Sequence, residues 1–212
     1  MAAGDLPQTT PEGMELRKQT PTRVVYAMPG ATLNTYGKVL LVDCYVAFEK
    51  NWERDYNRSS TFDGRVSTAD MERIKTDLAA EFRKVFSEQL AEAGHTIADS
   101  AGPDVLVVRP AIINLRVSAP DIMRAGFSNV IVDSAGAMTL YMELYDSETS
   151  AIIARIMDAR ADNRGFATRA TRGTNKMAAD RILRSWADEL ASHLADVTEK
   201  GETPAAGSQS GG

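Results

Sequence analysis

Cysteine, histidine and long apolar runs are all scarce in this sequence. Its single cysteine, Cys44, excludes an internal disulfide bond and any multi-cysteine zinc or iron–sulfur site. The two histidines, His95 and His193, have no closely spaced partner ligands, and each is better explained by a structural role near the end of a helix. No apolar run approaches the roughly 20 residues needed to cross a bilayer. We therefore expect no metal, no cofactor and no membrane-spanning segment.

Motifs that bind phosphate or activate a nucleophile are also absent. The sequence has no Gly-x-x-x-x-Gly-Lys-Ser/Thr loop, no Gly-x-Gly-x-x-Gly turn and no Gly-x-Ser-x-Gly elbow. Acids are plentiful, but the sequence does not show whether two of them meet across a cleft. Those on or beside predicted strands are Asp43, Glu49, Asp133, Glu143, Asp146 and Asp158. We expect a protein that is not an enzyme, with carboxylate chemistry as the least favoured alternative.

The overall composition is that of a globular protein with a small excess of negative charge. Hydrophobic residues make up 43% of the chain and charged residues 25%, which is close to the average for globular proteins. The formal net charge is −5 and the isoelectric point is about 5.2. The chain as a whole therefore has no attraction for a phosphate backbone, and we expect no nucleic-acid partner.

The two ends of the chain differ in composition from the middle. Residues 1–22 hold three prolines among Thr, Gln and Gly, which disfavours helix and sheet, and a short β-like run follows at 23–28. The C-terminal stretch is rich in Gly, Ala and Ser and has few apolar side chains to bury. We predict an extended leader or tether over 1–36, a single domain over 37–199 and a disordered tail over 200–212.

Alternating apolar residues predict the first strand of that domain, over 38–48. The apolar side chains of its buried face would be Leu40, Val42, Cys44, Val46 and Phe48. Cys44 lies in the middle of this face and has no evident basic neighbour to lower its pKa. We interpret it as a small buried hydrophobic residue rather than a reactive thiol.

Two segments have the three- and four-residue apolar spacing of amphipathic helices. The first begins after a cap at Ser67 or Thr68 and ends at Gly94, the usual glycine stop. Its stripe consists of Met71, Ile74, Leu78, Phe82, Val85, Phe86, Leu90 and Ala93. The stripe of the second, near 176–197, consists of Met177, Ile182, Leu183, Trp186, Leu190, Leu194 and Val197. The polar segments 51–64 and 162–175 are predicted to be loops.

The remaining strands lie between these helices. Residues 104–118 form a strand in which Val105, Val107, Ala111, Ile113, Leu115 and Val117 share one parity, and Pro110 requires an edge or a bulge because it has no N–H to donate. Residues 137–145 and 151–159 alternate across a short connection, which predicts an antiparallel hairpin. The long connection 119–135, with a short strand expected within 129–133, is a candidate binding element.

This order of elements predicts an α+β fold. The first strand, the first helix and the next strand need a crossover that leaves the two strands parallel. Because each helix has only one apolar stripe, the simplest arrangement is a two-layer α/β sandwich, a mixed sheet of about four strands with two helices on one face. Its other face, which is solvated, covered by the leader or used for association, would carry Tyr45, Thr139, Tyr141 and Tyr145.

Positive charge is concentrated between the last strand and the last helix. One reading is a contact for an anionic partner or a phospholipid headgroup; the simpler one is a solvated loop interleaved with Asp158, Asp162 and Asp180. The candidate contact residues are Arg160, Arg164, Arg169, Arg172 and Lys176, with Arg155 nearby in the sequence.

Three stretches together, 102–112, 138–146 and 146–154, resemble a bacterial family catalogued as domain of unknown function 3313. The likeness extends over roughly 37–196 and departs from the family pattern at Ser150, where a glycine is usual. Members are largely lipoproteins, so the resemblance implies export through a signal peptide and acylation of an N-terminal cysteine. Neither feature is present in this chain. The family brings no known catalytic residues.

The leading hypothesis is a non-enzymatic lipoprotein of the cell envelope that binds an envelope protein or stabilises an assembly, with a homo-oligomer as a further candidate. Its membrane contact would be an N-terminal lipid that this chain lacks. It would lie on the periplasmic side of a membrane, tethered to the outer membrane, or in the cytoplasm if Met1 is the native start. The alternative is a small-molecule or lipid-binding module that uses 119–135 as a lid.

Overall fold

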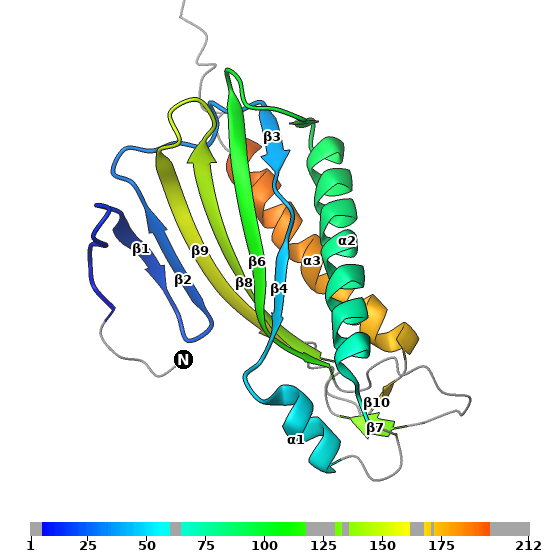
Figure 1. Cartoon of the computed structure of the whole chain (residues 1–212). Coiled ribbons are helices and arrows are strands. Elements are labelled where there is room, and N and C mark those ends of the chain that lie inside the picture. Colours follow the sequence, from blue (N-terminus) through cyan, green and yellow to red (C-terminus); the bar gives the residue numbers. More distant parts are fainter. Residues whose placement is uncertain are drawn as a thin grey trace, which may run out of the picture.

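In a computed structural model of the chain, two long helices pack on one face of a curved mixed sheet (Figure 1). The structure describes residues 6–59, 65–117, 130–132, 136–161, 168–170 and 172–195. Side chains from both helices and from the sheet share one apolar core, which includes Phe86 of the first long helix, Leu183 of the last and Val108 of the sheet. The α+β class and the placement of both helices on one face are confirmed.

The main sheet has eight strands, in the order β1-β2-β9-β8-β6-β3-β5 with β4 also beside β6. β3 and β4 run parallel to β6, as predicted for a crossover, and the neighbours from β6 to β1 are antiparallel. The bounds of these strands are β1 Glu15–Gln19, β2 Arg23–Ala27, β3 Lys38–Leu41, β4 Tyr45–Phe48, β5 Thr96–Ile97, β6 Val105–Val117, β8 Gly136–Asp146 and β9 Ile152–Ala161. The prediction of about four strands was therefore too low.

Two of the extra strands lie in the segment predicted to be a leader. β2 confirms the β-like run, but β1 corrects the irregular structure that we expected before it. The proline residues Pro7, Pro11 and Pro21 all lie outside both strands. A second apolar cluster lies on the face of the sheet away from the helices and holds this segment against the sheet. Its buried members are Met14, Val24 and Tyr26. The boundaries of the domain stay a prediction.

The strand predicted over 38–48 is interrupted between β3 and β4. Three residues, 42–44, separate Leu41 from Tyr45, whereas their partners in β6, Val108 and Ala111, are separated by only two. The additional residue changes which side chains face the core, from odd positions in β3 to even positions in β4. Val42 is consequently 41% exposed, which corrects its assignment to the buried face, while Cys44 is buried as predicted. The interruption lies beside Pro110.

The segment 51–64, predicted to be a loop, contains the short helix α1, Trp52–Ser59. Trp52 is buried and its ring stacks on Phe48 at a centroid distance of 4.5 Å and on Tyr56 at 5.4 Å. These stacks stabilise a helix whose other residues are mostly polar, which explains why hydrophobic periodicity did not reveal it.

The first long helix, α2 (Thr68–Glu92), has the predicted bounds. Ser67 is its N-cap and forms a capping box with Asp70, in which each side chain accepts a hydrogen bond from the backbone N–H of the other residue. At the other end, Gly94 has a φ of +91°, which glycine adopts without a steric cost.

The second long helix, α3 (Arg172–Ala195), begins earlier than the predicted loop allowed. Its core residues include Leu183, Trp186 and Leu190, as the apolar stripe indicated. Met177 is 61% exposed and does not contribute to that core, which corrects its assignment. None of the described helices is long and apolar enough to cross a membrane.

The hairpin of β8 and β9 is confirmed, but the buried parity of β6 is the reverse of the one expected. Leu106, Val108 and Ile112 face the helices, and a register shift between Ile113 and Arg116 returns Leu115 to the core. Asn114, within that shift, has a φ of +53°. A separate two-stranded sheet pairs β7 (Val130–Val132) with β10 (Thr168–Ala170); β7 is the short strand predicted within 129–133, and β10 was not foreseen.

Candidate binding groove

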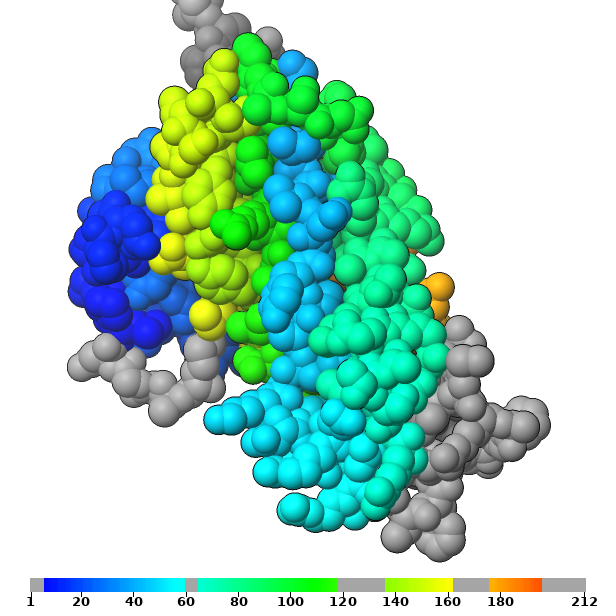
Figure 2. Space-filling view, viewed as in Figure 1, coloured from blue at the N-terminus to red at the C-terminus, as the bar shows by residue number. Residues whose placement is uncertain are grey.

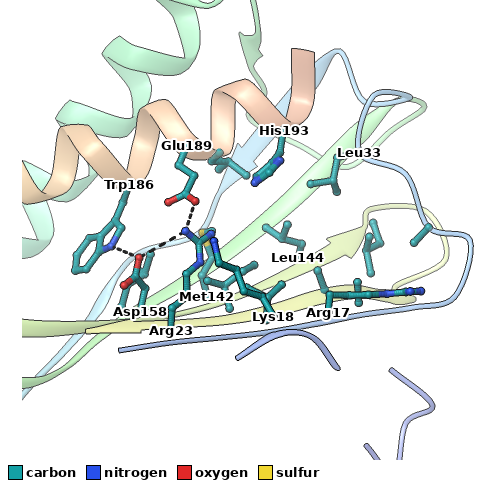
Figure 3. A pocket seen from close by; sticks show the side chains of 18 of the residues that line it. Arg17, Lys18, Arg23, Leu33, Met142, Leu144, Asp158, Trp186, Glu189 and His193 are labelled. Atoms are coloured by element: carbon teal, nitrogen blue, oxygen red, sulfur yellow. Dashed lines mark hydrogen bonds and ion pairs between the residues drawn. The ribbon is translucent and has the colours of Figure 1, made fainter. Parts of the chain in front are cut away.

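A groove of about 610 Å³ runs between α3 and the part of the sheet formed by β8, β9 and β2 (Figure 3). Its described lining comes from that part of the sheet, from β1, from the loop 31–34 and from one side of α3. We call this cavity the α3 groove. It lies between the two layers of the fold, at the side of the sheet away from α2.

The floor of the α3 groove consists of three rows of side chains that cross β8, β9 and β2. Strand register places the members of each row opposite one another on the helix-facing side. The first row is charged on β9 and β2, and the other two rows are apolar. The rows are Leu140–Asp158–Arg23, Met142–Ile156–Val25 and Leu144–Ala154–Ala27.

The third row leaves the groove hollow because two of its three side chains are alanines. Ala154 on β9 and Ala27 on β2 fill little of the space between the sheet and α3. Leu33, from the loop that follows β2, lines the groove near this row. The result is an apolar recess bounded on one side by a charged row.

The wall formed by α3 presents residues three and four positions apart, which lie on one side of a helix. Trp186 and Glu189 point toward the charged row, and His193 points into the groove on the side of Leu33 (Figure 3). Leu190 also lines this wall. One end of the groove is therefore lined by the charged row with Trp186 and Glu189. The other end is apolar and lies beneath the imidazole of His193.

Two carboxylates and two guanidinium groups connect the charged row of the sheet to α3. Asp158, which is 4% exposed, accepts hydrogen bonds from Nε1 of Trp186 at 3.1 Å and from Nη2 of Arg160 at 2.8 Å. Glu189 accepts one from Arg160 at 3.1 Å and another from Arg23, whose Nη1 also lies 3.9 Å from Asp158. We call these four charged residues the ionic cluster.

The ionic cluster is balanced, and this argues against acid–base chemistry. Burial alone would raise the pKa of Glu189, but the hydrogen bond and charge of Arg23, with the charge of Arg160, hold that pKa below its usual value. Glu189 is therefore ionised near neutral pH, and both carboxylates are occupied by guanidinium groups. Two acids do meet in a cleft here, but their carboxylate oxygens accept hydrogen bonds from guanidinium and indole donors that hold α3 on the sheet.

The predicted arginine cluster is only partly within the described residues. Arg160 faces Asp158 and Glu189, and its guanidinium lies 5.5 Å from the ring centroid of Trp186. Lys176 is largely exposed and lies 3.7 Å from Glu81 of α2. The side chains of Arg164, Arg169 and Arg172 lie outside the described residues. The anionic contact made of these five residues stays a prediction.

The predicted lid, 119–135, is likewise outside the described residues apart from β7. The groove residues that sequence reasoning missed include those of the assumed leader, which lie on β1, on β2 and in the loop 31–34. For Arg23, Val25 and Ala27 on β2, the signal that could have found them was their alternation with the large apolar residues Val24 and Tyr26.

The opposite face of the sheet is open over β9, β8, β6 and β4 (Figure 2). Glu143 is buried there and accepts hydrogen bonds from the hydroxyls of Tyr141 and Tyr145, each at 2.8 Å, and from Nε of Arg155 at 3.0 Å. Burial and the hydrogen bond to Glu143 raise the pKa of Tyr141 to about 12. Arg155 thus belongs to this face, and its charge is already neutralised.

The fold and the groove define an α+β domain with a lined apolar cavity whose described residues contain no group of three potential metal ligands. The chain belongs to the family described as protein of unknown function (DUF3313), whose model matches residues 15–190. The match begins at the first residue of β1, so it covers β1 and β2, which lie outside the resemblance inferred from the sequence over roughly 37–196. No curated protein matches the chain.

Several solved structures are similar at low identity. The PelC dodecamer from Paraburkholderia phytofirmans is 13% identical over 81% of this chain and 96% of that chain, with a TM-score of 0.41. Protein XCC0632 from Xanthomonas campestris is 14% identical over 83% and 94%, with a TM-score of 0.41. A minor lipoprotein from Acinetobacter baumannii is 11% identical over 76% and 94%, with a TM-score of 0.37.

Proposed function

We propose that this domain is a non-catalytic binding module of the bacterial cell envelope that holds an elongated apolar molecule in the α3 groove. The observation that carries the proposal is the apolar recess over Ala154 and Ala27, which neither layer of the fold fills. This is the second of the two main functions inferred from the sequence, and the groove replaces the 119–135 loop as its central feature.

The size and lining of the α3 groove support binding of a small molecule. A volume of about 610 Å³ falls within the range of roughly 300–1,000 Å³ that is typical of small-molecule sites. The five residues from Arg23 to Ala27 give the floor a length of roughly 13 Å, at about 3.3 Å per residue. Most of the floor is already shielded from water, so the favourable free energy of binding would come mainly from the apolar surface of the ligand itself, at about 25 cal/mol for each Å² that it buries.

The ionic cluster supports the proposal in a different way. Its hydrogen bonds hold α3 at a fixed distance from β9 and β2, so the recess beside it need not close when it is empty. A site formed in advance loses less conformational entropy when a ligand binds. We therefore assign Arg23, Asp158, Arg160 and Glu189 a positioning role.

Fluorescence of Trp186 offers a direct test. The chain has two tryptophans, so a Trp52→Phe variant reports on the groove alone. Titration with dodecanol, an uncharged probe, should change the emission of Trp186 and saturate. Ala154→Leu and Ala27→Leu, which fill the recess, should each weaken this binding by about tenfold, a difference of about 1.4 kcal/mol.

Ala111→Leu is the matched control, because Ala111 lies on the open face of the sheet between Tyr45 and Tyr141. It adds the same volume outside the groove and should leave the binding of dodecanol unchanged. The proposed function would be wrong if dodecanol did not bind the parent protein, or if all three variants bound it equally well.

The location in the envelope rests on family membership and on the lipoprotein character that the resemblance implies. Labelling of cells with an alkyne-tagged fatty acid, followed by fractionation, tests it. We expect the native protein to carry the label and to be in the outer-membrane fraction. Recovery of an unlabelled protein in the cytoplasm would contradict this part of the proposal.

A second candidate function is self-association through the open face of the sheet. It is favoured by Val42 and Tyr45, which are 41% and 66% exposed beside the interruption between β3 and β4. Light scattering should then give a mass above 23.0 kDa for the parent protein and a lower mass for a Tyr45→Ser variant. A monomeric parent protein would exclude this candidate.

A further inference from the structure

The charges that line the α3 groove are not evenly distributed. The two carboxylates of the lining, Asp158 and Glu189, are balanced by the guanidinium groups of Arg23, in the lining, and of Arg160, which lies beside it. The other charged residues of the described lining are Arg17 and Lys18, both on β1 and both cationic. After internal pairing, the groove therefore keeps an excess of positive charge on one side.

Strand register places Lys18 at the open end of an apolar row. Lys18 is opposite Val25 on β2, and Val25 continues into Ile156 and Met142. Exposure rises along this row, since Met142 and Ile156 are buried, Val25 is half-buried and Lys18 is exposed. Lys18 thus lies at the lip of the groove, where the apolar floor meets solvent.

The two cations of β1 that line the groove, Arg17 and Lys18, differ in their ion pairing. Nη2 of Arg17 lies 3.0 Å from a carboxylate oxygen of Glu15, and both side chains are about half exposed. Lys18 has no carboxylate partner within the described part of the chain, and its side chain extends from β1 toward α3 (Figure 3). It is the one cation of the described lining that an incoming anion can pair with at no cost to an existing ion pair.

We propose that the α3 groove is specific for a single-chain amphiphile with an anionic end group, whose aliphatic part lies over the apolar rows and whose charge lies at the lip beside Lys18. This inference rests on the proposed function and adds the ligand class. A cationic amphiphile would meet Lys18 and Arg17 and would find both groove carboxylates already paired. A two-chain lipid exceeds the size of ligand that a recess of about 610 Å³ encloses.

The test compares three probes that share one aliphatic chain and differ only in the end group: dodecanoate, dodecanol and dodecyltrimethylammonium. Calorimetric titration of the protein at low ionic strength and below micelle-forming concentrations should give the tightest binding for dodecanoate. We expect it to bind about fivefold more tightly than dodecanol, as for one solvent-exposed ion pair. Added salt should reduce this preference because it screens exposed charges.

Charge reversal at the lip assigns the preference to one side chain. Lys18→Glu should weaken dodecanoate binding by about tenfold and leave dodecanol binding unchanged. Lys50→Glu makes the same change of charge at an exposed position after β4, away from the groove lining, and should alter neither. Circular dichroism of both variants checks that they are folded.

The outcomes separate this inference from the function on which it rests. Equal affinity for the three probes, or a Lys18→Glu variant that binds dodecanoate as tightly as the parent, would overturn the anionic specificity. The proposed function would survive in that case if Ala154→Leu still weakened the binding of dodecanol. If none of the three probes binds the parent protein, the proposed function itself fails.

Discussion

The indole Nε1 of Trp186 on α3 donates a hydrogen bond of 3.1 Å to the buried carboxylate of Asp158 on β9. This bond connects the last helix to the sheet at the same place where Arg160 bridges Asp158 and Glu189. The contact fixes the ionic end of the α3 groove, so its loss should affect stability and groove geometry together.

Trp186→Phe tests this connection because it keeps an aromatic ring but removes the donor. Asp158 would lose one partner while staying buried, so we expect the free energy of unfolding to fall by about 2 kcal/mol. Urea unfolding followed by circular dichroism measures the change. Trp52→Phe, at a ring that stacks on Phe48, should cost less than half as much. Equal losses in the two variants would show that the hydrogen bond contributes little.

Acid sensitivity should depend on Glu189. Its folded-state pKa lies below the ordinary value of 4.5, because the partners Arg23 and Arg160 outweigh the effect of burial. A carboxyl with a lowered folded pKa contributes stability that is present above its unfolded pKa and is lost as the pH falls through the folded pKa. Unfolding free energy should therefore decline as the pH falls from about 5 toward 3, and this decline should be smaller in Glu189→Gln.

Glu72→Gln is the matched control for that measurement, since Glu72 lies on α2 with a side chain that is 64% exposed. Its pH dependence should follow that of the parent protein. A Glu189→Gln variant that loses stability in acid as steeply as the parent would refute the role of Glu189.

The N-cap residue of α2 should contribute about 1 kcal/mol to the free energy of unfolding. Ser67→Ala removes the hydroxyl that accepts from the backbone N–H of Asp70. Ser192→Ala is the comparison, because that hydroxyl bonds to the carbonyl of Asp188 within α3 and alanine has a high helix propensity. Thermal or urea unfolding should show a clear loss for the first variant and almost none for the second.

The sequence alone predicted those helices and strands whose ends are marked by local signals such as caps, glycine stops and short connections. The bounds of α2 follow from the capping residue Ser67 and the stop at Gly94, and the β8–β9 hairpin follows from alternation across a short connection. In contrast, the interruption between β3 and β4 has no local signal, since apolar residues alternate without a break from Leu40 to Phe48. It depends on pairing with β6, which is distant in the sequence.

The α3 groove could not be predicted for the same reason, because it depends on contacts between segments that are distant in the sequence. Its floor and wall come from three segments that are far apart in the sequence, 23–27, 140–158 and 186–193. The composition of each segment is visible, but the row of Ala154 beside Ala27 exists only once β2 has joined β9. Because the first segment was assigned to a leader, a cavity could not be predicted there.

The thiol of Cys44 should be almost inert in the folded protein. Burial raises its pKa to about 12, so very little thiolate is present at pH 8, and the thiolate is the reactive form. We expect iodoacetamide to label the native protein at least about 100-fold more slowly than the protein unfolded in urea, where the pKa returns to about 8.5. A Val42→Cys variant with Cys44→Ala provides the comparison, because position 42 is 41% exposed and lies two residues away. That thiol should react rapidly without denaturant. Rapid labelling of Cys44 in the native protein would mean that the segment between β3 and β4 opens readily, and that this side chain is not held in the core.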